Sequence, residues 1–125
     1  MGVEIMQGLT MARVEVACRV VTSGAPHDFA DEIRFTSTCG RTFLLHHHQD
    51  CCENVCIEDI AGDVEDLVGS PILMAEEATS VAEVEHESGT WTFYKFATNK
   101  GYVTIRWLGT SNGYYSESVD FEEVE

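Results

Sequence analysis

The sequence predicts a single α+β domain over residues 1–125, mostly antiparallel β-sheet with a C-terminal three-stranded meander and one or two short helices. Three observations support this prediction. The length is that of one domain. Short runs of alternating apolar and polar residues, separated by turn residues, are typical of half-buried strands. Only one segment carries both a helix start and a helix stop signal. Residues 1–11 show no such pattern, which leaves room for disorder there.

The first half of the chain is predicted to contain a strand, a hairpin and a further strand. Residues 14–21 alternate roughly and precede turn residues at 24–28. A strand at 33–37 and its partner at 41–48 flank a tight turn at 38–40, which predicts a hairpin. Residues 55–60 form the next short strand.

The middle of the chain is predicted to hold the helical element. Asp63 is suited to cap a helical turn over 63–68, and Gly69 is suited to end it. Residues 71–79 could be a strand or a short helix, and we favour a strand. Residues 80–89 are expected to form an acidic loop.

The last third predicts the meander. Strands are expected at 90–98, 102–108 and 114–121, because aromatic and β-branched residues alternate there. Residues 99–101 form the first turn, and the Ser-Asn-Gly sequence at 111–113 is a hairpin signal for the second. The apolar faces of this meander require a second layer, for which the earlier hairpin and the short helix are available.

The charge of the chain is strongly negative. It has 22 acidic and 7 basic residues, a net charge of −15, and no base between Thr42 and Tyr94, where twelve acids lie. Such a surface repels phosphate backbones and anionic membranes, so we expect no direct nucleic-acid or membrane binding. It attracts basic protein surfaces or metal cations, although high charge also serves solubility alone.

The cysteines predict a reducing compartment. There are five, an odd number without a common disulfide spacing. The first ten residues lack a signal-peptide layout, and no apolar run approaches membrane length. We therefore expect reduced thiols in a cytoplasm.

Residues 46–53 combine three histidines, two cysteines and two carboxylates. Imidazole and thiolate are zinc ligands, which makes His47, Cys51 and Cys52 candidates for a structural zinc site. Adjacent cysteines on an extended chain point to opposite faces, and no second spaced pair is visible. The alternative is a local hydrogen-bonded bend of His47, Asp50 and Glu53 with one cysteine buried.

A nucleophilic pair is a further interpretation of the same segment, with a thiolate activated by His47. No residue supplies an oxyanion hole or an orienting third group, so no catalytic residue is assigned. Candidate binding residues come from this segment, from the acidic run after it and from the C-terminal aromatic segment. They are His47, Gln49, Asp50, Glu53, Glu58, Asp59, Arg106, Tyr114, Tyr115 and Glu117.

Several motifs resemble a family of small phage and prophage proteins that contain a domain of unknown function. They are H-x-Q-D-C-C-E at 47–53, I-E-D-I at 57–60, G-S-P-I at 69–72, A-E-E at 75–77, T-W-T-F-Y-K-F-A-T at 90–98, V-T-I-R-W at 103–107 and S-N-G-Y-Y-S-E at 111–117. The similarity covers about residues 30–121, without His46 and His48. It implies expression in the cytoplasm of an infected bacterium, and no activity.

Three functions are compatible with these features. The first is a phage-encoded acidic binding protein that inhibits a bacterial defence system or host factor by occupying a basic protein surface. The second is a protein that sequesters a small ligand such as a nucleotide signal, for which Arg106, Lys95 and Tyr114 could line a pocket. The third is a small metal- or thiol-dependent enzyme that uses residues 47–53.

Overall fold

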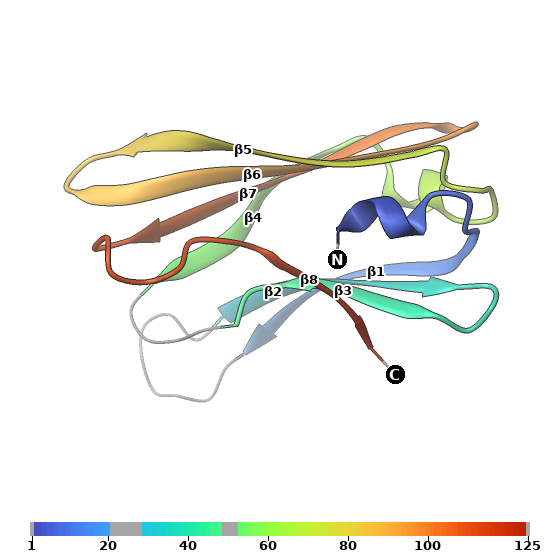
Figure 1. The fold of residues 1–125 in the computed structure, drawn as a ribbon, viewed down its shortest axis with the longest axis horizontal. Helices are drawn as coiled ribbons and strands as arrows, with labels where there is room; N and C mark the ends of the chain where they lie inside the picture. Colours follow the sequence, from blue (N-terminus) through green and yellow to red (C-terminus); the bar gives the residue numbers. More distant parts are fainter. Residues whose placement is uncertain (1, 21–28, 49–52, 125) are drawn as a thin grey trace.

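The computed structural model describes residues 2–20, 29–48 and 53–124. Eight strands form two four-stranded sheets, with the orders β1-β2-β3-β8 and β4-β7-β6-β5, and every pairing is antiparallel. The strands are β1 (Met11–Val20), β2 (Phe29–Ser37), β3 (Thr42–His46), β4 (Asn54–Ala61), β5 (Met74–Val84), β6 (Glu87–Thr98), β7 (Gly101–Ser111) and β8 (Asp120–Val124). The two sheets lie one above the other as two layers (Figure 1).

The prediction of an α+β fold is wrong, because the described chain is nearly all β and contains no α-helix. Its helical elements are two single 3-10 turns, η1 (Val3–Met6) and η2 (Val64–Leu67). Asp63 does cap η2, since its side chain accepts a hydrogen bond from the Glu65 amide. The turn stays short because Gly62 and Gly69, both with positive φ, bound a segment of only a few residues between two strands.

The core lies between the two sheets and follows the alternation of the strands. Apolar residues at every second position of β2, β3, β6 and β7 point inward and are fully buried. They are Ile33, Phe35, Phe43, Leu45, Tyr94, Phe96, Val103, Ile105 and Trp107. Phe35 of one sheet lies against Phe96 of the other, with ring centroids 5.4 Å apart. The predicted second layer is therefore a second sheet.

The N-terminal residues belong to this core. Val3, Met6 and Met11 are fully buried. The Gly8 amide donates to the Ile72 carbonyl, and the Ile72 amide donates to the Leu9 carbonyl, which joins this segment to the chain before β5. Residues 2–11, for which the sequence left room for disorder, are thus held by buried side chains and by backbone hydrogen bonds.

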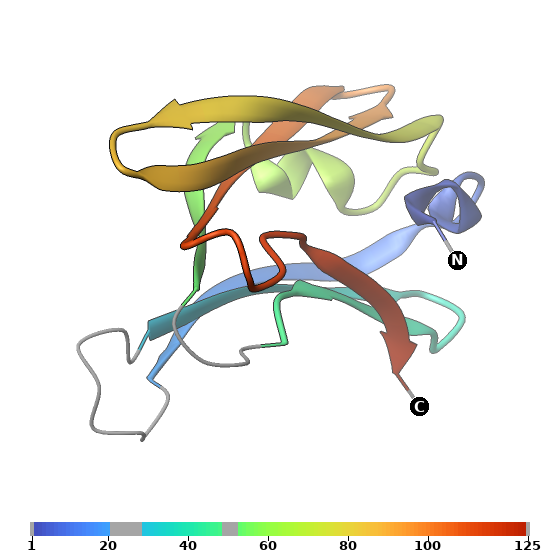
Figure 2. The ribbon, with the colours of Figure 1, turned by 60° about the vertical axis from the view of Figure 1, so that its left-hand side comes forward.

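The predicted C-terminal meander is only two-thirds right. Strands β6 and β7 form the expected hairpin, with Thr98 paired to Gly101. The third strand does not pair with β7, because β4 already occupies the other edge of β7. Residues 112–119 instead cross from one sheet to the other, and β8 pairs with β3 (Figure 2). The Ser-Asn-Gly sequence at 111–113 begins this crossing and not a hairpin.

The predicted acidic loop at residues 80–89 is also wrong. These residues form the end of β5, the turn at Glu85–His86 and the start of β6, with Val84 paired to Glu87. The hairpin carries exposed polar side chains on both faces. Its sequence therefore lacks the alternation of apolar and polar residues by which a half-buried strand is predicted. None of the described helices has the length and apolar character needed to cross a bilayer.

Candidate functional site at the end of strand β3

The end of β3 presents its three histidines to two different environments. Alternation along an extended chain sends His46 and His48 to one side and His47 to the other. His47 enters the interior and is buried, whereas His48 is exposed and His46 is half-buried. The predicted histidine cluster is therefore two separate sites, one on each side of the strand.

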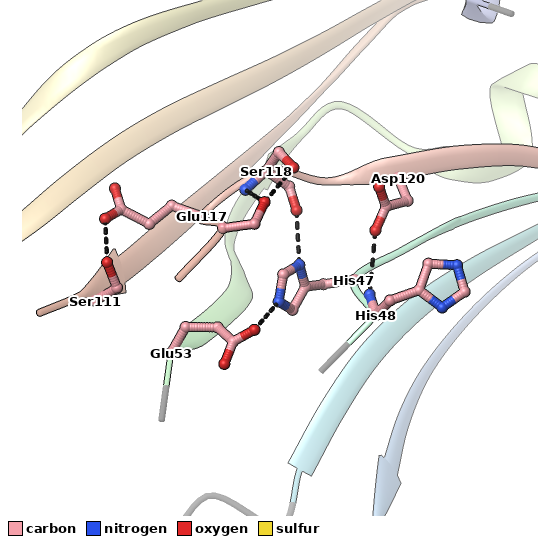
Figure 3. A network of polar contacts seen from close by, with 8 residues as sticks. His47, His48, Glu53, Ser111, Glu117, Ser118 and Asp120 are labelled. Carbon is pink, nitrogen blue, oxygen red and sulfur yellow. Dashed lines mark hydrogen bonds and ion pairs between the residues drawn. The ribbon is translucent and has the colours of Figure 1, made fainter. Parts of the chain in front are cut away.

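The inward site is a buried chain of three groups (Figure 3). His47 Nε2 lies 2.8 Å from Oε2 of the fully buried Glu53, and Nδ1 lies 2.7 Å from the backbone carbonyl oxygen of Ser118. A carbonyl oxygen can only accept, so Nδ1 carries a hydrogen. One further proton is then shared between Nε2 and Glu53, which makes the pair neutral overall whichever group holds that proton.

This arrangement ties three chain segments together. His47 follows β3, Glu53 precedes β4, and Ser118 belongs to the crossing segment 112–119. Because both ring nitrogens are engaged, the imidazole has no free nitrogen for a metal or for a substrate proton. The geometry therefore gives His47 a structural role, and its contact with Glu53 is the part of the predicted bend that lies within the described residues.

Glu117 holds the crossing segment 112–119 against the β4-β7-β6-β5 sheet. Its carboxylate accepts hydrogen bonds from Ser111 on β7 and from Thr90 and Ser88 on β6. Burial raises the pKa of Glu117, but the three hydroxyl hydrogen bonds outweigh it and the pKa is lowered overall. The backbones meet at Gly109, where a Cβ atom would clash with the Glu117 carbonyl oxygen.

The outward site combines His46, His48 and Glu122. His46 Nε2 lies 2.7 Å from Glu122 Oε1, and His48 Nε2 lies 3.9 Å from the same oxygen. The two imidazole rings meet edge to face with centroids 4.5 Å apart. Asp120 on β8 fixes the end of the strand, since its carboxylate accepts from the His48 amide at 3.1 Å (Figure 3). A nitrogen, nitrogen and oxygen donor set is thereby assembled across β3 and β8.

The structure does not gather the other predicted binding residues into one site. Gln49, Asp50, Cys51 and Cys52 lie outside the described residues, so the bend is described only through His47 and Glu53. Glu58 and Asp59 are exposed on β4. Arg106 on β7 is paired in register with Asp59, on the sheet opposite to β3. Tyr114 is exposed and Tyr115 half-buried in the crossing segment.

Sequence reasoning missed His46, His48 and Glu122 as a group. The i, i+2 spacing of the two histidines on a predicted strand was the available signal, because it places both on one face. Glu122 gave none, since its position beside these histidines depends on the pairing of β8 with β3. That pairing joins segments far apart in the chain and leaves no local trace.

A separate hollow of about 370 Å³ lies on the outer face of the β4-β7-β6-β5 sheet, lined by Glu76, Ala78, Phe93, Lys95 and Thr104. Arg106 is paired in register with Phe93, and its guanidinium lies 4.9 Å from the centre of the Trp91 ring. Arg106 Nε is buried without a hydrogen-bond partner among the described residues. Of the pocket linings predicted from the sequence, Lys95 lines this hollow.

The comparison with protein families decides the relationship of the chain. Residues 8–121 match the model of a domain of unknown function, DUF7448. The chain belongs to the DUF7448 family. The DUF7448 match spans β1 to β7 and reaches the start of β8, so both sheets belong to it. Predicted membership of a family without a known function is confirmed, and the phage origin stays a prediction. Searches among curated proteins and among solved structures found no match.

Proposed function

We propose that this DUF7448 domain is an acidic binding protein that occupies a basic surface of a bacterial protein. The proposal rests on one observation, which is the unequal pairing of acids in the two sheets. On the β1-β2-β3-β8 sheet, Arg13, Arg34 and Arg41 form salt bridges, and their acidic partners are Glu15, Glu32 and Glu123. The Arg41–Glu123 pair is bidentate, at 2.8 and 2.9 Å.

The β4-β7-β6-β5 sheet lacks this neutralisation. Residues 54–111 contain ten acids and three bases. Among the described residues, no Lys or Arg forms a salt bridge with any of these ten acids. The three bases have other neighbours: Lys100 donates to the Val68 carbonyl, Arg106 lies over Trp91, and Lys95 lines the hollow.

The β5–β6 hairpin is the part of this sheet best placed to meet a partner. Strand β5 is an edge strand, so one side of its backbone is not paired within the sheet. Glu83, Glu85 and Glu87 surround the turn, and all three are exposed. Complementary charge speeds encounter and adds specificity, and salt weakens it. A basic surface would supply the neutralisation that the sheet itself lacks.

The resemblance to phage proteins supports the setting of the proposal. A phage-encoded domain of this kind acts in the cytoplasm of the infected bacterium. Its partner there is a defence protein or host factor whose basic surface serves another ligand. Occupying that surface inhibits the partner without any chemistry in the DUF7448 domain.

The test is co-purification from infected cells at low salt, about 50 mM, with elution by rising salt. The variant Glu83→Gln with Glu87→Gln should lose most of the captured basic protein. The variant Glu4→Gln with Glu65→Gln is a matched control, because it removes two exposed carboxylates away from the hairpin. Capture of no basic protein, or equal loss in both variants, would contradict docking through the hairpin.

The hollow favours a second candidate, the sequestering of a small anionic ligand such as a nucleotide. Phe93 offers a ring for stacking, and Lys95 and Arg106 offer positive charge on the same face. Any ligand of the native state stabilises it, so a thermal-shift screen against cyclic nucleotides tests this function. A true ligand raises the melting temperature of the native chain and not of Lys95→Ala. If none of these ligands in excess raises the melting temperature, the candidate function is ruled out.

A further inference from the structure

We propose that His46, His48 and Glu122 form a binding site for a divalent transition-metal ion, with zinc as the physiological occupant. One donor atom from each residue takes part, and these three atoms all lie within 4.8 Å of one another. The proposal is independent of docking to a basic protein, since the site lies on the other sheet.

The donor geometry fits an ion of this class. Ligand atoms sit about 2.0–2.2 Å from a zinc ion, so neighbouring donors are about 3–3.6 Å apart. The distances from His46 Nε2 and His48 Nε2 to Glu122 Oε1, 2.7 and 3.9 Å, lie on either side of that range. Small rotations about side-chain bonds would bring all three donors to one point without moving the strands.

The donor chemistry also selects the ion. Two imidazole nitrogens and one carboxylate oxygen suit zinc and its neighbours in the transition series, and are a poor set for Ca²⁺ or Mg²⁺, which prefer oxygen ligands. Three protein donors leave a coordination position for water or for a partner's side chain. Such an ion would also join β3 to β8, which is an edge strand of five residues.

The backbone prepares the site. Asp120 accepts from the His48 amide, which holds His48 in line with the strand although β3 ends at His46. His47 is anchored on the opposite side by Glu53 and Ser118. A peptide fixed in this way keeps both flanking imidazoles turned to the same face. The site is distinct from the one predicted from the sequence, in which His47 would join Cys51 and Cys52.

Zinc titration by isothermal calorimetry, on the untagged and reduced whole chain, tests the proposal. We expect one zinc ion per chain. His48→Ala and Glu122→Gln should each weaken binding at least about tenfold, since even the loss of groups behind the ligands costs that much. His86→Ala is the matched control, because His86 is an exposed histidine 3.3 Å from Glu85 on the other sheet. It should bind zinc as the native chain does.

A second pair of variants separates the two possible zinc sites. The double variant Cys51→Ser with Cys52→Ser should retain zinc binding, and zinc should raise the melting temperature of this variant by more than that of Glu122→Gln at the same zinc concentration. Three results would overturn the proposal: no zinc binding by the native chain, unchanged binding by both His48→Ala and Glu122→Gln, or loss of binding in the cysteine variant.

Discussion

At the scale of the residue, the His47–Glu53 pair is a buried polar contact at the junction of three chain segments. Both groups are buried, and the pair connects the end of β3, the start of β4 and the crossing segment. Breaking a buried pair by removing one partner is costly, because the other group loses a hydrogen bond in a place that water does not reach. Loss of the pair should therefore weaken the attachment of the crossing segment to the end of β3.

We predict that His47→Ala lowers the free energy of unfolding by about 3–5 kcal/mol. Glu53→Gln should cost less than half as much, because the amide keeps the volume and can still donate to Nε2. Urea denaturation of both variants measures the difference. His86→Ala should change stability by less than about 0.5 kcal/mol, because the His86 and Glu85 side chains are both 88% exposed. Equal losses in His47→Ala and His86→Ala would contradict the role of the buried pair.

Glu117 should make stability depend on pH. Its pKa is lowered in the folded chain relative to the ordinary value of 4.5. The stabilisation is therefore fully present above the unfolded-state pKa and is lost as pH falls through the folded pKa. We predict that the stability difference between the native chain and Glu117→Gln shrinks as pH falls below about 4.5. Denaturant melts at several pH values measure it, and a difference that grows on acidification would contradict a lowered pKa for Glu117.

At the scale of the element, η1 is a structural part of the fold, and its two faces can be separated by mutation. Met6 is fully buried, whereas its neighbour Ile5 is 37% exposed. We predict that Met6→Ala costs about 2–5 kcal/mol, because it removes buried side-chain volume and leaves a cavity. Ile5→Ala should cost less than about 1 kcal/mol. Thermal or urea unfolding compares the two, and a silent Met6→Ala would mean that η1 is not docked in solution.

Sequence patterns predicted the elements whose partners are close in the chain. The hairpin of β2 and β3 and that of β6 and β7 both follow from alternation on either side of a turn. The pairing of β8 with β3 and of β7 with β4 could not be predicted, because alternation fixes the face of a side chain and not the partner strand. The missing helix has a similar cause. A cap at Asp63 starts a helical turn, but the neighbouring strands decide its length.

The candidate site was predicted in part for the same reason. His47 and Glu53 are six residues apart, so a local bend could be proposed from the sequence. Ser118 and Glu122 reach the same region only through the long-range pairing of β8. The sequence could indicate only that His46 and His48 face one way, because residues two positions apart on a strand share a face.

At the scale of the whole molecule, the net charge of −15 acts on stability through its distribution. Among the described residues, the acids of the β4-β7-β6-β5 sheet form no salt bridge with Lys or Arg. These acids repel one another across the surface. Salt screens such repulsion over about 8 Å at physiological strength. We predict that the melting temperature of the free protein rises between about 10 and 200 mM sodium chloride. A melting series in both solutions measures the effect.

A charge-reduced variant is the control for this prediction. Glu83→Gln with Glu87→Gln should show a smaller rise with salt than the native chain, because two of the repelling carboxylates are gone. A melting temperature that falls with added salt in the native chain would mean that attraction outweighs repulsion. The acidic surface would then have no need of a basic partner.

The position of β8 has a consequence for synthesis on the ribosome. Chains fold from the N-terminus as they emerge, and the β2–β3 hairpin is available early. The free edge of β3 is covered only by residues 120–124, which are made after all four strands of the other sheet. Until those residues emerge, residues 42–46 present an open strand edge to other nascent chains. During this interval of translation residues 42–46 are exposed to mispairing, and the arrival of β8 replaces their edge with that of a strand of only five residues.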